Sequence, residues 1–276
     1  MATVKNTLKN LSYNAFIIKT IRFFRLRSLV RKVYYYWDRP KNGILNVTVM
    51  GLPAKFHVRN PDELRLAESV SGQWGELPVI EGFLSHIHTG DVVFDVGANI
   101  GIYTILLAKK VGATGKVIAF EPEKESYDRL VDNAGINDLK NIIVQKKALG
   151  QEDKQAKLYI GKTTGNFSLI KSYEKGVGSQ DIEIVSGDAF LKAQNLPVPK
   201  AVKIDVEGYE YNVLVGLQET LRQPSCKVIC CEVHPGLFPD GVTEETVLKY
   251  IESLGFTETK MFKRAFSAYH IIACKP

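Results

Sequence analysis

The sequence has no long uninterrupted apolar run. None of its 276 residues belong to a stretch of about 18 consecutive apolar residues, the length that a membrane-spanning helix needs. The most apolar N-terminal stretch, AFIIKTIRFF, contains Lys19 and Arg22 and lacks a small-residue cleavage site, so it does not resemble a signal peptide. We therefore expect a cytoplasmic protein without a transmembrane helix.

Cysteine is scarce as well, with four in the whole chain. Cys230 and Cys231 are neighbours in the apolar run VICCEV, which is typical of a buried strand. No C-x-x-C pair occurs, which argues against a disulfide framework and against a cysteine-based zinc site. We expect reduced cysteines in the core of an intracellular protein.

Outside the first 41 residues the chain has no excess of positive charge. Those residues hold ten Lys and Arg against one Asp, which leaves 26 basic and 29 acidic residues in the remainder. The net charge of +6 therefore belongs to an N-terminal arm, residues 1–42. A slightly acidic body without an N-P-P-Y-like motif argues against nucleic acid as a partner.

Residues 8–37 are predicted to form a basic amphipathic helix that ends in an aromatic cluster, residues 34–37. Such a helix packs on its own domain, packs on a second subunit of a homodimer, or lies on an anionic membrane surface. Packing on protein is favoured, and peripheral contact with the inner face of a membrane is the alternative. The apolar residues at helical spacing are Phe16, Ile17, Ile21, Phe24, Leu29 and Val33.

The remainder of the chain is predicted to be α/β. Residues 43–90 would form an entry region, with a hairpin at 44–58 and a helix near 79–87. Residues 91–276 alternate between strands and helices, the pattern of a parallel sheet with right-handed crossovers, and end in an antiparallel hairpin. The predicted strands are 92–96, 116–121, 141–145, 201–206, 227–233, 256–263 and 266–274, with extended pieces at 157–160 and 182–185; the helices are 102–111, 124–134, 209–221 and 244–254.

The segment VFDVGANIG, residues 93–101, carries the first strand into a glycine turn. In open parallel sheets the ligand binds beyond the carboxyl ends of the strands. Gly97 and Gly101 allow the backbone to turn and to approach a ligand closely. Glu121 ends the next strand about 20 residues later, the place from which an acid binds a ribose diol. The ligand is therefore predicted to contain a ribose.

Two side chains of this turn argue against a dinucleotide. A pyrophosphate needs a glycine at the second position of the fingerprint, where this chain has Asn99. The nearby carboxylate of Asp95 repels phosphate but attracts the ammonium and sulfonium groups of S-adenosylmethionine. We therefore predict S-adenosylmethionine as the cofactor, with an NAD-dependent oxidoreductase and a non-catalytic cofactor-binding module as less favoured alternatives.

Six motifs resemble, in their order, those of the FkbM family of S-adenosylmethionine-dependent methyltransferases: VFDVGANIGIYT, VIAFEPEKESYDRL, KALG, GNFSLIK, VKIDVEGYEYNVLVG and CCEVHPG. The resemblance covers residues 85–275 and implies a Rossmann-like class I methyltransferase fold, with a seven-stranded, mostly parallel sheet, an antiparallel C-terminal hairpin and helices on both faces. It implies contact with the adenine by Ala148 and Leu149. The predicted cofactor-binding residues are Asp95, Gly97, Ala98, Asn99, Gly101, Glu121, Pro122, Ala148, Leu149 and Asp205.

Two strand ends hold the candidate catalytic groups. Lys203, Asp205 and Glu207 alternate onto one side of a strand, and charged residues are rarely buried unless they are paired or functional. His234 ends the next strand, and its ordinary pKa suits a general base. We predict that His234 and Asp205 assist as bases, that Glu207 takes part in catalysis, and that Lys203 neutralises the carboxylates. The alternatives are a helix N-terminal role for Glu207 and a structural hydrogen bond for His234.

Asp205, Glu207, Glu232 and His234 could also gather a divalent metal ion that acidifies a hydroxyl. Nothing in their spacing requires one, so the sequence does not lead us to expect a metal.

The acceptor is predicted to contact Asn166 and Ser168. Their loop is shorter and less glycine-rich than the N-x-G-x-x-S pattern of the family. Methyl transfer is an in-line displacement that requires a positioned acceptor and removal of its proton. We predict an O-methyltransferase acting on a hydroxyl of a glycan or glycolipid sugar, with a lipid or secondary metabolite as the alternative acceptor.

Overall fold

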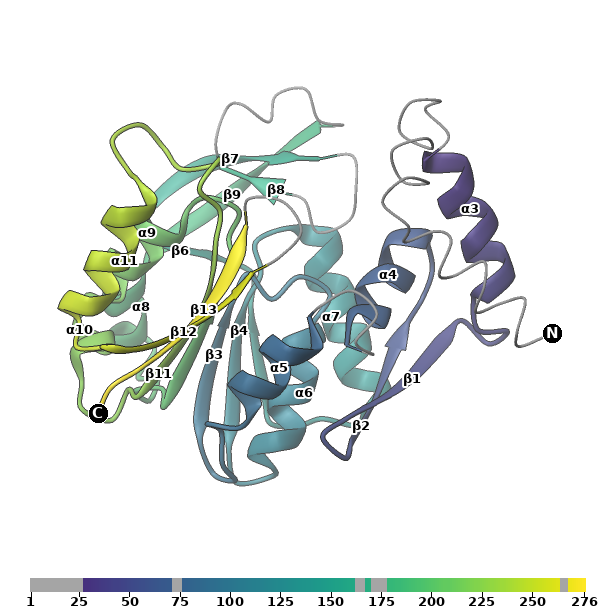
Figure 1. Ribbon diagram of the computed structural model, residues 1–276, viewed down its shortest axis with the longest axis horizontal. Helices are drawn as coiled ribbons and strands as arrows, with labels where there is room; N and C mark the ends of the chain where they lie inside the picture. The colour runs from purple at the N-terminus through teal and green to yellow at the C-terminus, as the bar shows by residue number, and fades with distance from the viewer. Residues whose placement is uncertain (1–26, 71–75, 162–166, 170–177, 264–267) are drawn as a thin grey trace.

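Seven strands form the central sheet, in the order β12-β13-β11-β10-β3-β4-β5 (Figure 1). The computed structural model describes residues 27–70, 76–161, 167–169, 178–263 and 268–276. Strands β11, β10, β3, β4 and β5 pair in parallel, and β13 lies antiparallel between β11 and β12. This confirms the mostly parallel sheet with an antiparallel C-terminal hairpin. The bounds are β3 (Val92–Val96), β4 (Lys116–Phe120), β5 (Ile142–Gln145), β10 (Ala201–Ile204), β11 (Val228–Val233), β12 (Glu258–Lys263) and β13 (Tyr269–Cys274).

Helices cover both faces of this sheet (Figure 1). Because successive strand residues point to opposite faces, Val93 enters one apolar core and Phe94 the other. The first core lies under α5 (Leu77–Leu84) and α6 (Ile102–Val111), with α7 (Lys124–Ile136) beside them, and the second under the helices of the C-terminal half. Those helices are α8 (Gly187–Ala193), α9 (Glu210–Gly216), α10 (Gln218–Arg222) and α11 (Glu244–Ser253).

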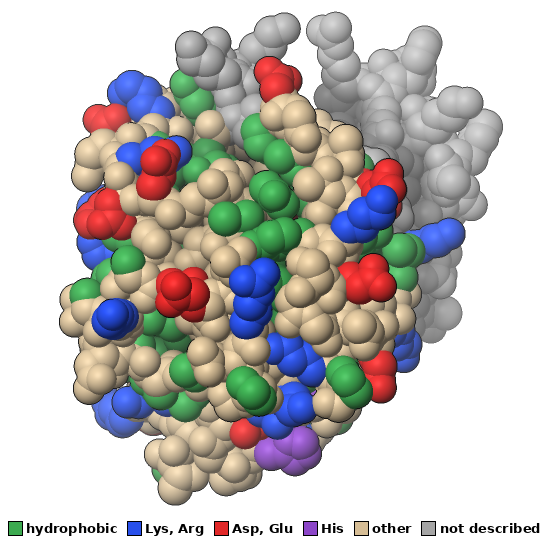
Figure 2. Space-filling view, turned by 90° about the vertical axis from the view of Figure 1, so that its left-hand side faces the viewer, with side chains coloured by type: hydrophobic (Ala, Val, Ile, Leu, Met, Phe, Trp, Pro, Cys, Tyr) green, Lys and Arg blue, Asp and Glu red, His purple; other side chains and the backbone are tan. Residues whose placement is uncertain are grey.

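The face that carries these C-terminal helices is shown in Figure 2, where acidic and basic side chains are interspersed.

The predicted helix 209–221 is divided at Leu217 into α9 and α10, and α8 was not predicted. Three of the four cysteines, Cys226, Cys230 and Cys231, are buried and unpaired, which confirms the prediction that they belong to the core.

A second sheet of four strands, in the order β6-β9-β7-β8, lies above one end of the central sheet in Figure 1. The sequence predicted only two extended pieces here. In the structure, β7 and β9 pair antiparallel over seven residues, and β6 runs parallel to β9. The strands are β6 (Ala148–Gly150), β7 (Lys154–Ile160), β8 (Phe167–Ser168) and β9 (Gly178–Ser186).

The entry region contains the predicted hairpin, β1 (Ile44–Val49) and β2 (Leu52–His57). It also contains an unpredicted helix, α4 (Pro61–Ser69), which begins at a cap where the Asn60 side chain accepts hydrogen bonds from the backbone N–H groups of Asp62 and Glu63. An asparagine cap followed by proline in the first turn is a typical start signal for a helix.

Of the predicted N-terminal arm, residues 1–26 lie outside the described part of the chain, and α3 (Arg27–Asp38) is described. This helix packs on the domain, because the Tyr34 hydroxyl donates to Glu68 of α4 at 3.0 Å and Tyr35 is buried. Tyr36 and Trp37 are 68% and 60% exposed. No helix in the described residues is long and apolar enough to span a membrane.

Candidate active site

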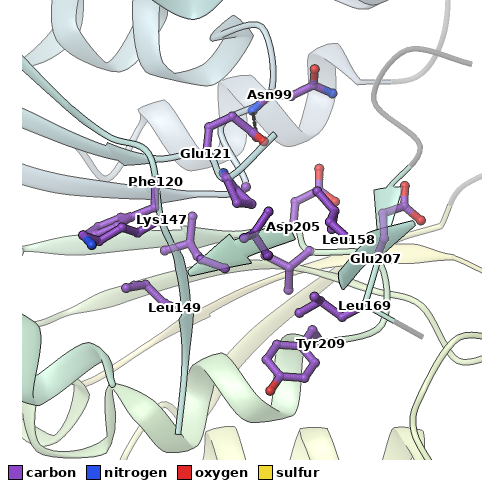
Figure 3. A pocket seen from close by; sticks show the side chains of 16 residues that line it. Asn99, Phe120, Glu121, Lys147, Leu149, Leu158, Leu169, Asp205, Glu207 and Tyr209 are labelled. Carbon is purple, nitrogen blue, oxygen red and sulfur yellow. Dashed lines mark hydrogen bonds between the residues drawn. The ribbon is translucent and has the colours of Figure 1, made fainter. Parts of the chain in front are cut away.

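A cavity opens at the carboxyl ends of β3, β4 and β10 (Figure 3). Strands β3 and β10 are neighbours, but the helices that follow them, α6 and α9, cover opposite faces of the sheet. Ligands of open α/β sheets bind at such a switch point. The cavity is lined by Val96, Gly97, Asn99, Phe120, Glu121, Pro122, Lys147, Ala148, Leu149, Leu158, Leu169, Ile182, Asp205, Val206, Glu207 and Tyr209.

The glycine turn approaches β10 more closely than any side chain would allow. Gly97 has a φ of +76°, and a Cβ on it would lie 1.8 Å from the carbonyl oxygen of Asp205. Asn99 has a φ of +52°, in the left-handed region that asparagine tolerates better than most residues. Asn99 therefore replaces the missing fingerprint glycine in backbone conformation. Of the other predicted turn residues, Ala98 and Gly101 do not line the cavity, and Gly101 begins α6.

Glu121 is held in place by backbone donors. Its Oε2 accepts a hydrogen bond from the Asn99 N–H at 2.7 Å, and its Oε1 accepts one from the Glu123 N–H at 2.8 Å. Burial raises the pKa of Glu121 to about 7. Each carboxylate oxygen can accept a second hydrogen bond, so the pair can bind the two hydroxyls of a ribose.

The carboxylate of Asp95 is fully buried and does not line the cavity. Its Oδ2 accepts a hydrogen bond from the Thr104 hydroxyl at 2.5 Å, and its Oδ1 lies 3.4 Å from Nζ of Lys203. Asp95 and Lys203 are paired in the parallel register of β3 and β10, which explains the contact. Asp95 therefore lies outside the cavity lining, and its role beside the cofactor stays a prediction.

Lys203 connects the two halves of the site. Its ammonium donates to the carbonyl of Gly97 at 2.9 Å and lies 3.5 Å from Oδ2 of Asp205. Burial by itself lowers the pKa of Lys203, but the carboxylates of Asp205 and Asp95 outweigh it and hold the pKa above its ordinary value. Lys203 therefore stays charged and fixes the turn against the end of β10.

His234 is buried among carboxylates. Its Nδ1 lies 2.7 Å from Oε1 of Glu210, and its Nε2 lies 3.7 Å from Oε2 of Glu207 and 3.6 Å from Oε1 of Glu232. Burial lowers the pKa of His234, but the hydrogen bond to Glu210 and the charges of Glu210, Asp205 and Glu207 raise it to about 10. In this arrangement His234 carries a proton at neutral pH, so the prediction of a general base from its ordinary pKa does not fit these surroundings.

Glu207 reaches the cavity from a strained backbone position. Its φ is +50°, a region that costs free energy for a residue with a side chain and is often found at functional sites. Burial raises the pKa of Glu207 to about 8, and the neighbouring carboxylate of Asp205 adds to this, against the opposing effect of His234. The Ser168 hydroxyl donates to the Glu207 carbonyl at 3.2 Å. Ser168 itself is buried and does not line the cavity, and Asn166 lies outside the described residues.

Two acids of this cluster received no separate role from the sequence. Glu210 is fully buried, and besides contacting His234 it accepts a hydrogen bond from the Gly208 N–H at 3.0 Å. Glu232 lies between two histidines, with its Oε2 3.2 Å from Nε2 of His270. Both acids stand inside the motifs KIDVEG-x-E and E-x-HP, which is the signal that could have identified them.

The FkbM methyltransferase domain model matches residues 95–258. The chain belongs to this family. It is 31% identical over 212 residues to the hexuronic acid methyltransferase AglP of Haloferax volcanii, covering 75% of this chain and 83% of that protein. It is 28% identical over 166 residues to methyltransferase sdnD of Sordaria araneosa, covering 49% of this chain and 64% of that protein.

Two solved structures of methyltransferase-fold proteins are also similar. One is an S-adenosylmethionine-dependent O-methyltransferase from Thermotoga maritima, 14% identical, with a TM-score of 0.48 over 84% of this chain and 77% of that one. The other is fibrillarin from Aeropyrum pernix in complex with S-adenosylmethionine, 13% identical, with a TM-score of 0.46 over 86% of this chain and 84% of that one.

Membership of the FkbM family makes this chain an S-adenosylmethionine-dependent methyltransferase. The family resemblance and the enzyme class predicted from the sequence are thereby confirmed. The oxidoreductase and the non-catalytic module are excluded by the same finding.

Proposed function

We propose that this FkbM methyltransferase is an O-methyltransferase that acts on a hydroxyl of a glycan sugar, with a uronic acid residue as the first acceptor to test. One observation carries the proposal. The same cavity is lined by the fixed carboxylate of Glu121 and by two further carboxylates, those of Asp205 and Glu207. In Figure 3 these two lie to the right of Glu121. The hexuronic acid named for the Haloferax volcanii relative supports a uronic acid as acceptor.

The cavity residues fit the parts of S-adenosylmethionine. Phe120 and Leu149 offer apolar walls for an adenine, at the end of the cavity that Lys147 also borders in Figure 3. Glu121 would accept hydrogen bonds from the ribose, and the turn at Asn99 would border the remainder of the cofactor. The bound cofactor supplies an electrophilic methyl group.

The acceptor hydroxyl would approach from the side of Asp205 and Glu207. As its oxygen bonds to the methyl carbon, the bond from that carbon to the cofactor sulfur would break and S-adenosylhomocysteine would leave. The hydroxyl proton has to leave as well, and a protonated His234 is unable to take it. We assign proton acceptance to the carboxylate of Asp205, which lines the cavity. His234, fixed by Glu210, holds Glu207 in place.

The test is a product analysis with the full chain, S-adenosylmethionine, and matched glycosides of glucuronic acid and of glucose. We expect S-adenosylhomocysteine and a singly methylated uronoside, with the neutral glycoside a poorer acceptor. Mild alkali identifies the position, because it hydrolyses a methyl ester on the carboxyl group but leaves a methyl ether on a hydroxyl. An alkali-labile product would overturn the assignment to a hydroxyl.

Two aspartate variants provide the internal comparison. Asp205→Asn is expected to reduce the transfer rate by a factor of about 100 or more, the range for loss of a general base. Asp128→Asn removes an acid of the same type that forms an exposed ion pair with Lys124 on α7 and should leave the rate unchanged. Equal rates in the two variants would contradict the role of Asp205.

A further inference from the structure

Three side chains from two strand ends converge beside the cavity. Asp205, Glu207 and His234 each bring one oxygen or nitrogen atom to within 4.8 Å of the others. Ligands that share one divalent ion at about 2.0–2.3 Å lie roughly 3–4.5 Å apart, so small side-chain movements would close this group around an ion. Imidazole and carboxylate are established ligand types for divalent cations.

The orientation of His234 independently indicates a ligand at its second nitrogen. The side chain is 7% exposed, and its Nδ1 is engaged by Glu210 at 2.7 Å. Metal-bound histidines characteristically donate their other ring N–H to a carboxylate in this way. Within the described part of the chain Nε2 makes no hydrogen bond, and the nearest carboxylate oxygens lie at 3.6 and 3.7 Å. Nε2 of His234 thus lies among acids, with no partner in the described residues at hydrogen-bond distance.

The charge around the cluster also favours a cation. Glu207, Glu210 and Glu232 all lie within 4 Å of His234. Lys203 contacts Asp205, but it divides its charge between Asp205 and Asp95. Carboxylates brought this close together repel one another unless positive charge lies between them.

We propose that Asp205, Glu207 and His234 bind one divalent cation, such as Mn²⁺, beside the acceptor end of the cavity. The cation takes the place of the proton on Nε2 of His234, while Nδ1–H donates to Glu210, which orients the ring. This rests on the proposed O-methyltransferase function and deepens it. An ion with three protein ligands keeps open positions for oxygens of the acceptor, and it would lower the pKa of a bound hydroxyl. Asp205 would ligate through one oxygen, which leaves its second oxygen to receive the hydroxyl proton.

The test is a titration of Mn²⁺ into the full chain after removal of metals with a chelator and removal of the chelator. Electron paramagnetic resonance measures the free Mn²⁺ at each point. We expect one saturable site per chain, with the dissociation constant raised at least about 10-fold in Glu207→Gln and in His234→Gln, as for loss of a ligand or of its support. The matched control, Asp181→Asn, removes one acid from an exposed ion pair with Lys157 and should bind Mn²⁺ as the wild type does.

Binding of S-adenosylhomocysteine by each variant, measured without metal, shows that the variant is folded and separates this proposal from the proposed function. No saturable Mn²⁺ binding by a chain that binds S-adenosylhomocysteine would overturn the cation site and leave the methyltransferase assignment intact. The cation site would also be overturned if both variants bound Mn²⁺ with the affinity of the wild type. Saturable Mn²⁺ binding without methylation of any sugar acceptor would instead preserve the cation site and refute the glycan acceptor.

Discussion

The two ends of the cavity are built by different kinds of contact. At the end where we propose that the cofactor binds, the donor end, Glu121 is held by backbone N–H groups of Asn99 and Glu123, close in the chain to the glycine turn and β4. Beside the proposed acceptor end, His234 is held by Glu207 from a loop and by Glu210 from α9. The donor end therefore follows from local backbone geometry, whereas the acceptor end depends on the convergence of distant residues.

This difference suits what each end has to recognise. A cofactor common to a whole family can be bound by a turn whose backbone sets the geometry, largely independent of other side chains. The proposed acceptor would instead be bound by side chains, which substitution can change. Lys203 couples the two ends, because it donates to the Gly97 carbonyl on one side and contacts Asp205 on the other.

The largest expected effect comes from breaking that coupling. Lys203→Met keeps the length of the side chain but leaves the buried Asp95 without its counter-charge. Removing one partner of a buried ion pair costs about 3–5 kcal/mol, so we expect the free energy of unfolding in urea to fall by that amount. Lys157→Met, in an exposed pair with Asp181, is the control and should unfold as the wild type does. A stable Lys203→Met variant would show that the two ends are independent.

A second substitution tests the glycine turn alone. In Gly97→Ala the new Cβ would collide with the Asp205 carbonyl. The residue would also have to keep a positive φ, which alanine disfavours. We expect a loss of about 2–4 kcal/mol in thermal unfolding, from steric overlap and backbone strain together. Gly135→Ala is the matched control: it lies in α7 with no atom within 4 Å of the new Cβ, and should gain about 0.5–1 kcal/mol. Equal stabilities would mean that the turn does not need its close approach to β10.

A third change separates binding from stability at the donor end. Glu121→Gln keeps the shape of the side chain but replaces one of the two acceptor oxygens by an amide NH₂ that faces a backbone N–H. We expect calorimetric titration to give a dissociation constant for S-adenosylhomocysteine raised about 10- to 100-fold, the loss of a charge-assisted hydrogen bond. Glu125→Gln, an exposed acid at the start of α7, should bind normally. Unchanged affinity in Glu121→Gln would show that the ribose does not bind to Glu121.

The same contrast explains what the sequence could predict. The strand Val92–Val96 and the helix Ile102–Val111 were predicted with the bounds that the structure has, because apolar periodicity and the glycine turn are local signals. Residues of the turn, Glu121 and the first strand-end motif line one cavity, whereas His234 of the second motif lies beside it and does not line it. The four-stranded sheet was missed, because β7 and β9 pair across the intervening residues 161–177 and their register has no local signal.

The surroundings of Asp95 and His234 were not predicted, because long-range contacts decide them. Asp95 turns away from the cavity because its neighbour in the sheet register is Lys203, and a single sequence does not reveal which strands become neighbours. The pKa of His234 is raised because Glu210 reaches it from α9 and Glu207 from the preceding loop. A histidine at a strand end has an ordinary pKa only if its neighbours are neutral, and those neighbours are known only once the chain is folded.

The smallest predicted effect is the pH dependence of S-adenosylhomocysteine binding at the donor end. Because burial raises the pKa of Glu121 to about 7, this carboxyl group is mostly ionised at pH 8 and mostly protonated at pH 6. The ionised form accepts the ribose hydrogen bonds, so affinity for S-adenosylhomocysteine is retained above pH 7 and lost as the pH falls through it. Calorimetric titration between pH 8 and pH 6 should show a dissociation constant that rises by up to about 10-fold, as one pKa unit allows. Glu121→Gln should remove this dependence, and a slope that persists in the variant would assign the titration to another group.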